Sequence, residues 1–243
     1  MVCQDLPDYT RKVIIEYTGG FVGLEELATR LGFIAPFNLQ GNLVMMEDFE
    51  TEATEWYLTP GGGLSTVTRQ TRHKWSGNWA IELFTDDVGG AVSQVARAVH
   101  YPGDLKYGLF GRFMWDDAIQ DVILGCTVFT GTRQIEVWVQ YIGAINALNI
   151  WDSTGGYVPI DAAFDLHNAL LTWYPLLLVF DTATEMWVSL RIGGYSIDLS
   201  TYALDAVGLV ASPYIWIVAS NGAYLGTGHT SYVDDIVLTK NVP

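Results

Sequence analysis

The stretch SYVDDIVLT (residues 231–239) has the residue pattern of a β-strand. Its β-branched and aromatic residues favour a strand, in which successive side chains point to opposite faces. Both faces are mostly apolar, so the pattern predicts a strand buried on both sides. Simple alternation places Asp234 on one face and Asp235 on the other. Because a buried, unpaired carboxylate is costly, we expect these two groups to be paired, protonated or bound to a metal.

Similar segments follow one another from Asn42 onward, separated by Gly, Asp, Asn, Thr and Pro. No helical segments alternate with them, and FDTATEM (180–186) predicts a hairpin turn. The pattern indicates an all-β protein with an antiparallel β-sandwich. Besides 231–239, the predicted strands are NLVMMEDFE (42–50), NWAIELFT (78–85), VSQVARAV (92–99), KYGLFGRFMW (106–115), DVILGCTVFT (121–130), RQIEVWVQYI (133–142), WYPLLLVFD (173–181), MWVSLRIGG (186–194) and YIWIVAS (214–220).

The N-terminal segment differs from the rest of the chain. RKVIIEYT (11–18) predicts a short strand, and GLEELATRLG (23–32) predicts a short helix that ends at Gly32. One strand and one helix cannot bury a core alone. We therefore divide the chain into an N-terminal strand-helix arm (1–41) and a β-sandwich domain (42–243). The arm is expected to pack on the main domain, on a partner or on a neighbouring copy.

Composition excludes some classes of partner. The formal net charge is −15, and the basic residues are scattered along the chain. This argues against nucleic acid, because phosphate contacts need clustered Lys and Arg, and it argues equally against an anionic membrane surface. No apolar stretch is long enough for a membrane helix. The N-terminus is polar and lacks the apolar core of a signal peptide, so we expect synthesis in the cytoplasm without a signal peptide.

Two strands predict a polar face that carries a tryptophan. In residues 133–142, Glu136, Trp138 and Gln140 lie opposite an apolar face, and in residues 186–194 Trp187 lies on the side of Arg191. Pyranose rings stack on indoles, while carboxylate, amide and guanidinium groups bind hydroxyls. These five residues are therefore our candidate carbohydrate-binding residues. The alternative is that both tryptophans pack beneath a loop or a neighbouring subunit.

Several short motifs resemble those of carbohydrate-binding jelly-roll domains and concanavalin A-like lectins. The resemblance spans residues 42–239 and implies a jelly-roll β-sandwich of a kind that also occurs on virus and phage particles. The opening motif matches at Asp48, Phe49, Glu50, Trp56, Ser76, Gly77, Ala80, Ile81 and Leu83, the middle hairpin at Trp173, Asp181, Thr184 and Gly193, and the closing strand at Tyr232, Val233, Asp234, Asp235 and Ile236.

The resemblance also implies a metal site. In such jelly rolls the first and last strands meet, and a structural Ca²⁺ often lies there, bound by carboxylate and carbonyl oxygens. Asp48, Glu50, Asp234 and Asp235 are the residues of this chain that would hold it. The alternative is that Asp235 caps backbone amides while Asp234 is solvated at the end of the strand.

No motif in the sequence indicates catalysis. The four histidines stand far apart, and neither a G-x-S-x-G elbow nor the Q-x-H strand of similarly shaped polysaccharide lyases occurs. Cys3 and Cys126 have no zinc-ligand spacing, and two free thiols are expected rather than a disulfide. We therefore expect that the chain is not an enzyme.

Two functions remain open. The first is a structural or assembly protein, namely a virion or phage surface component that docks on particle subunits, or on copies of itself, through residues 1–41. Only 16% of the residues are charged, which fits large contacts between subunits as well as one large core. The alternative is a carbohydrate-binding module or lectin that recognises a polysaccharide, alone or severed from a glycoside hydrolase. Its location would be extracellular by another route.

Overall fold

The fold is a sandwich of two antiparallel β-sheets. The structure, a computed structural model, describes residues 41–50, 55–60, 62–87, 91–116, 121–161, 164, 166, 171–222 and 228–243. These residues form sixteen strands and one short 3-10 helix, Gly143–Ile145, and none of their helices is long and apolar enough to span a membrane. The predicted all-β sandwich is confirmed. The predicted strand 11–18 and helix 23–32, together with Cys3, lie outside the described residues.

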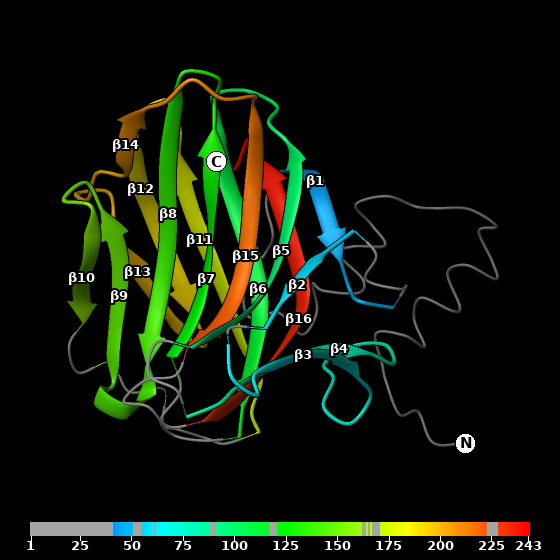
Figure 1. The fold of residues 1–243 in the computed structure, drawn as a ribbon. Helices are drawn as coiled ribbons and strands as arrows, with labels where there is room; N and C mark the ends of the chain where they lie inside the picture. The colour runs from blue at the N-terminus through cyan, green and yellow to red at the C-terminus, as the bar shows by residue number, and fades with distance from the viewer. Residues whose placement is uncertain are drawn as a thin grey trace, which may run out of the picture.

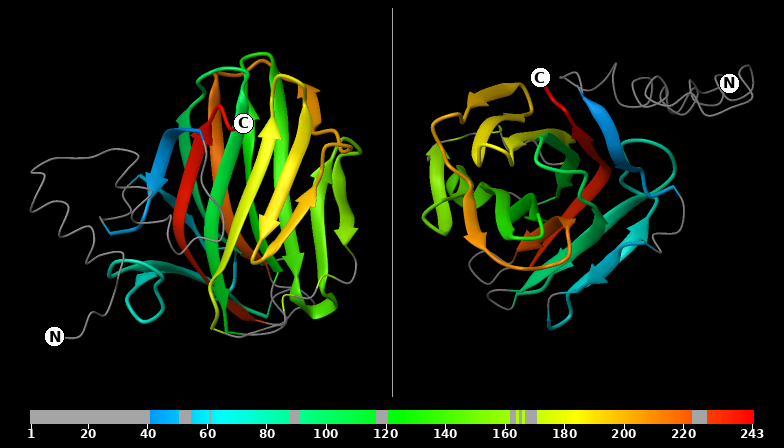
Figure 2. Two further views of the ribbon diagram at one scale, coloured as in Figure 1. Left: turned by 180° about the vertical axis from the view of Figure 1, so that it is seen from behind. Right: turned by 90° about the horizontal axis from the view of Figure 1, so that it is seen from above.

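Each sheet contains eight strands (Figure 1). Sheet A has the order β13 (Tyr195–Asp198), β12 (Met186–Ile192), β11 (Tyr174–Asp181), β6 (Lys106–Trp115), β16 (His229–Lys240), β4 (Ala80–Thr85) and β3 (Thr66–Gln70), and β1 (Asn42–Glu47) also pairs with β16. Sheet B has the order β10 (Gly156–Asp161), β9 (Ala147–Asp152), β8 (Arg133–Ile142), β7 (Asp121–Phe129), β15 (Tyr214–Gly222), β5 (Val92–His100) and β2 (Tyr57–Thr59), and β14 (Asp205–Gly208) also pairs with β8. The outer face of sheet B points toward the viewer in Figure 1, and that of sheet A in the left view of Figure 2.

The closing strand β16 changes its neighbour halfway along its length. It pairs with β4 up to Val233 and with the first strand β1 from Ile236 onward. At the change, β16 has one residue more than β6, and Asp235 adopts a φ of 50°. This β-bulge interrupts the alternation of faces. Because of it, Asp234 and Asp235 both reach the loop between β3 and β4, where the backbone N–H of Ser76 donates to Asp234 and its hydroxyl to Asp235.

Apolar side chains from both sheets fill the space between them. Trp115 of β6 stacks on Tyr174 with ring centroids 4.7 Å apart, and it also stacks on Tyr141 of sheet B. Cys126 lies on the inner face of β7 as a free, fully buried thiol, and burial raises its pKa. Because the core is filled and apolar, chemistry on polar ligands is confined to the outer faces and the ends of the sandwich.

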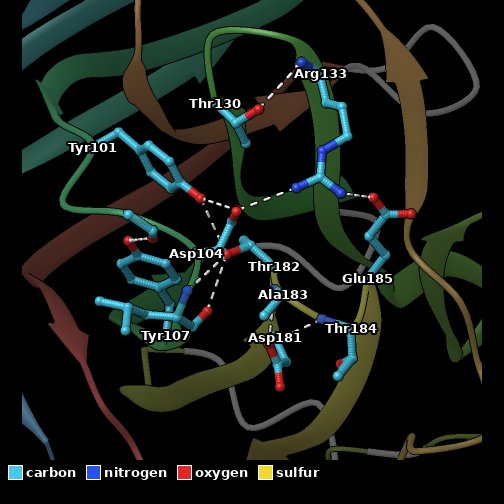
Figure 3. A network of polar contacts seen from close by, with 12 residues as sticks. Tyr101, Asp104, Tyr107, Thr130, Arg133, Asp181, Thr182, Ala183, Thr184 and Glu185 are labelled. Carbon is cyan, nitrogen blue, oxygen red and sulfur yellow. Dashed lines mark hydrogen bonds and ion pairs between the residues drawn. The ribbon is translucent and has the colours of Figure 1, made fainter.

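A polar network joins the two sheets at one end of the sandwich (Figure 3). Arg133, at the start of β8, pairs with Asp104 of the β5–β6 connection and with Glu185 of the β11–β12 hairpin. The hairpin turn is the one predicted from the sequence, and Asp181 accepts hydrogen bonds from two of its backbone amides, Ala183 and Thr184. Arg133 thereby ties a strand of sheet B to a turn of sheet A.

Candidate functional site

A row of aromatic side chains crosses the outer face of sheet B. Strand pairing places these residues on adjacent strands, because directly paired residues lie side by side on one face of a sheet. Trp151 follows Ile150, which pairs with Val139, and therefore lies beside Trp138. From β2 to β10 the paired residues are Tyr57, Ala96, Val218, Gly125, Trp138, Trp151 and Tyr157. Its aromatic members are Tyr57 at one edge and Trp138, Trp151 and Tyr157 toward the other. We call this set the aromatic row.

Gly125 gives the Trp138 indole its place in this row. A Cβ atom on Gly125 would lie 2.6 Å from Cε3 of Trp138 and 2.2 Å from the backbone oxygen of Val137. Such distances are far inside van der Waals contact, so only glycine allows this approach. The indole therefore lies against the backbone of β7, and its ring is held on the surface of the sheet.

Carboxylates hold the two central indoles in fixed orientations. Trp138 Nε1 donates to Oε2 of Glu136, which also accepts a hydrogen bond from Thr127 Oγ1 at 2.8 Å. Trp151 Nε1 donates to Oδ2 of Asp205 at 2.8 Å. Since both N–H groups are satisfied within the protein, the rings are pre-organised for stacking.

A second row of polar side chains lies beside the aromatic row. Asn149 Nδ2 donates to Oε1 of Gln140 at 3.0 Å, and Gln140 Nε2 donates to Oδ2 of Asp121 at 3.1 Å. Burial is the main cause that raises the pKa of Asp121 to about 6. Its Oδ1 accepts no hydrogen bond from any described residue. The amides and the carboxyl group together offer donors and acceptors of the kind that bind hydroxyl groups.

The face has an aromatic pair toward each edge of sheet B. Tyr57 and Trp216 lie with ring centroids 5.1 Å apart, and Tyr57 is 61% exposed. Trp151 and Tyr157 meet edge to face, also with centroids 5.1 Å apart. Burial raises the pKa of the Tyr157 hydroxyl above its ordinary value. This hydroxyl therefore stays protonated and is able to donate a hydrogen bond at neutral pH.

The structure separates the five predicted carbohydrate-binding residues. Glu136, Trp138 and Gln140 lie together on the outer face of sheet B, within the network just described. Arg191 lies on sheet A, where it pairs with Leu177. Trp187 is fully buried in the core, and its Nε1 donates to the backbone oxygen of Trp151.

The placement of Trp187 corrects the expectation from alternation. Phe180 pairs with Trp187, whereas the preceding Val179 pairs with Ser189, so Val188 is an additional residue in β12. The bulge changes the phase of the strand. It directs Trp187 into the core beside Phe180, while Arg191 stays on the outer face, and the two residues therefore cannot share a ligand.

The four predicted calcium ligands are occupied by donors from the protein. Asp235 pairs with Arg112, and Asp234 accepts hydrogen bonds from the backbone amides of Trp75 and Ser76. Glu50 accepts from the amides of Asn78 and Trp79, and Asp48 accepts from Glu50 N at 3.2 Å. Within the described part of the chain, no three Asp, Glu, His or Cys side chains form a group that could hold a metal ion. This arrangement does not fit the Ca²⁺ site that we expected.

Sequence reasoning found three residues of this site and missed most of the others. The residues that were not predicted are Tyr57, Asp121, Asn149, Trp151, Tyr157, Asp205 and Trp216. One signal was present for Trp216, which stands between Ile215 and Ile217 in a predicted strand, so that alternation places it on the face opposite to these two apolar residues. Trp151, Tyr157 and Asp205 lie on β9, β10 and β14, which were not predicted as strands.

Comparison with known structures identifies the fold. The chain is similar to an endo-beta-1,4-glucuronan lyase from the fungus Trichoderma reesei, with a TM-score of 0.54, 11% identity, and coverage of 82% of this chain and 95% of that one. It is also similar to a sialidase, with a TM-score of 0.52, 10% identity and coverage of 84% of this chain, but the match spans 19% of the sialidase chain. A lectin, UEA-II complexed with galactose, has a TM-score of 0.48, 8% identity and coverage of 83% and 100%.

The matches to the glucuronan lyase and the sialidase, which both have TM-scores above 0.5, confirm the predicted β-sandwich fold. No protein-family model matches the chain, and no curated protein matches it. The comparisons contradict the expectation that the chain is not an enzyme, because the glucuronan lyase and the sialidase are enzymes that contain this fold. Missing catalytic motifs therefore do not exclude catalysis on this scaffold.

Proposed function

We propose that this protein binds carbohydrate on the outer face of sheet B. The observation that carries the proposal is the Trp138 indole, which lies against Gly125 and has Glu136 as its hydrogen-bonded neighbour. A sugar presents an apolar C–H face together with hydroxyl groups around its rim. A fixed indole offers a stacking surface for the first, and the surrounding carboxylates and amides accept and donate hydrogen bonds to the second.

A glycan array followed by titration calorimetry tests the proposal. We expect Tyr57→Ala, on the short edge strand β2, to weaken binding of the best glycan about fivefold, because stacking on an exposed ring is worth on the order of 1 kcal/mol. Tyr195→Ala is the matched control, since Tyr195 is 45% exposed on edge strand β13 of the other sheet. Equal affinities of both variants and the unmodified chain would contradict the proposal.

The same incubations test for cleavage of the bound glycan. Analysis of the recovered oligosaccharide by mass spectrometry distinguishes a binding protein, which returns it intact, from a hydrolase or a lyase. A hydrolase adds one water to the products, whereas a lyase leaves a double bond in one of them. Either form of cleavage leaves the binding proposal in place and adds an activity to it.

The assembly role at a virion surface stays a prediction from the sequence. It depends on residues 1–41, nearly all of which lie outside the described part of the chain. Light scattering of the full chain beside a chain that starts at Asn42 tests it. If the full chain forms oligomers and the shortened chain is monomeric, docking through the arm is supported. If both chains form particles with the same number of copies, it is contradicted.

A further inference from the structure

We infer that the outer face of sheet B selects extended, uncharged oligosaccharide chains and rejects polyuronates. This inference rests on the proposed carbohydrate-binding function and adds the class of ligand to it. Two observations carry it: the sign of the charges on the face, and the separation of its two aromatic pairs.

The charged side chains of this face are acidic. Asp121, Glu136 and Asp205 contribute carboxyl groups that face the same side as the aromatic row, as their strand pairing shows. All described Lys and Arg residues lie elsewhere. Arg69, Arg72 and Lys74 belong to β3 and the loop after it, Lys106, Arg112, Arg191 and Lys240 belong to sheet A, and Arg133 belongs to the network at the end of the sandwich.

Arg97 belongs to β5 of sheet B but does not face the aromatic row. It pairs across the sheet with Ile217, whose side chain belongs to the core. Its guanidinium group bonds to Glu47 and Glu55. The described residues therefore offer a uronate carboxylate no lysine or arginine on this face, where His100, paired with Tyr214 at the end of β5, is the one described histidine.

A polyuronate would bring one carboxylate per sugar against these acids. Two like charges about 8 Å apart repel by on the order of 1 kcal/mol at the intermediate dielectric constants of a protein surface. Because of two such encounters, a uronate chain would bind at least about tenfold more weakly than its neutral counterpart. A neutral sugar carries no charge for these carboxylates to repel, so the electrostatic cost falls on the uronate alone.

The aromatic pairs fit a chain that runs across the strands. Trp216 lies on β15 and Trp151 on β9, with β7 and β8 between them. Three strand spacings of about 4.8 Å place these two strands about 14 Å apart, and the two rings are also offset along the strands, since Trp216 is in register with Glu136 and Trp151 with Trp138. Trp138 lies between them, with Thr127 and Glu136 beside it. A chain of several sugar rings would therefore stack at both ends and on Trp138, and its hydroxyl groups would face the polar side chains beside that ring.

Matched oligosaccharides that differ only in the oxidation of C6 test the inference. The probes are hexasaccharides of β-1,4-glucan and β-1,4-glucuronan, and of β-1,4-mannan and β-1,4-mannuronan, titrated calorimetrically into the full chain at low salt. We expect the neutral member of a pair to bind at least about tenfold more tightly than the uronate, and its disaccharide to bind more weakly than the hexasaccharide.

Variants of the acidic residues then assign the discrimination to this face. Glu136→Gln and Asp205→Asn should each narrow the affinity ratio between the neutral and the uronate hexasaccharide about threefold, and added salt should narrow it as well. Asp198→Asn is the matched control, because it removes the same charge from β13 of sheet A. It should leave the ratio unchanged.

Each outcome has a separate meaning. A uronate that binds as tightly as its neutral counterpart would overturn the inference and leave the carbohydrate-binding function in place. A neutral disaccharide that binds as tightly as the neutral hexasaccharide would overturn the inference that the face takes an extended chain. If none of the four hexasaccharides binds and the glycan array is also blank, both the inference and the proposed function fail.

Discussion

Arg112 forms an ion pair with Asp235 within sheet A, and the side chains are only 2% and 3% exposed. The guanidinium group lies 4.6 Å from the ring centroid of Trp75 and 4.9 Å from that of Phe110. Burial and the charge of Asp235 raise the pKa of Asp234 well above its ordinary value. The adjacent aspartates therefore close the gap between β4 and β1 with an arginine as their counter-charge.

Replacing Arg112 should be among the most destabilising changes in the chain. Arg112→Met leaves a buried carboxylate without its partner, which typically costs about 3–5 kcal/mol of the free energy of unfolding. Denaturant titration measures the loss. The double variant Arg112→Met with Asp235→Asn should recover part of it. Arg191→Met, on the same sheet but only partly buried, is the control and should cost less than about 1 kcal/mol. A similar loss in both single variants would contradict the role of the buried pair.

The carboxyl group of Asp121 should make stability depend on pH. Its folded pKa is raised to about 6, so the native state binds a proton that the unfolded chain has already lost. The unfolding free energy should therefore fall as pH rises from about 4 to about 7, by at most about 3 kcal/mol. The measurement compares denaturant titrations of the unmodified chain and Asp121→Asn across this range, and the fall should be smaller in the variant, in which the raised pKa of Asp234 remains.

Asp198→Asn is the control for this pH dependence. A hydrogen bond from Ser200 lowers the pKa of Asp198, so its contribution to stability is lost as pH falls and the sign of the effect is opposite. If Asp121→Asn followed the unmodified chain at every pH, the raised pKa would be refuted.

Gly125→Ala should damage both stability and the aromatic row. The new methyl group would overlap the Val137 carbonyl and the Trp138 ring, and overpacking of this kind typically costs about 1–3 kcal/mol. We expect lower thermal stability and weaker glycan binding by the fraction that stays folded. Gly194→Ala is the control, because nothing lies within 4 Å of its added Cβ. Unchanged binding in Gly125→Ala would show that the position of Trp138 is not needed.

Trp187→Ala should change stability and not ligand affinity. Its side chain is fully buried between the sheets, and removal of such a side chain typically costs about 3–5 kcal/mol. Calorimetric titration at a temperature where the variant is folded should return the affinity of the unmodified chain. A loss of affinity without a loss of stability would instead restore Trp187 as a surface residue.

Local sequence pattern was enough to identify several strands and one part of the site. The predicted ends of β6 and β8 agree with the structure, because both are long strands of β-branched and aromatic residues bounded by turn residues. Alternation correctly brought Glu136, Trp138 and Gln140 to one face of β8. The side-chain period of a regular strand is a local property, so the sequence alone determines it.

Only the tertiary structure decided what lies beside these residues. The bulges at Val188 and Asp235 form where neighbouring strands pair out of step, which sent Trp187 into the core and both aspartates to one loop. The aromatic row joins the edge strand β2 to β8, β9 and β10, which lie far from β2 in sequence. Register between such strands is set by cross-strand packing over the whole sandwich, and a local window of sequence around β2 does not contain its neighbours in this row.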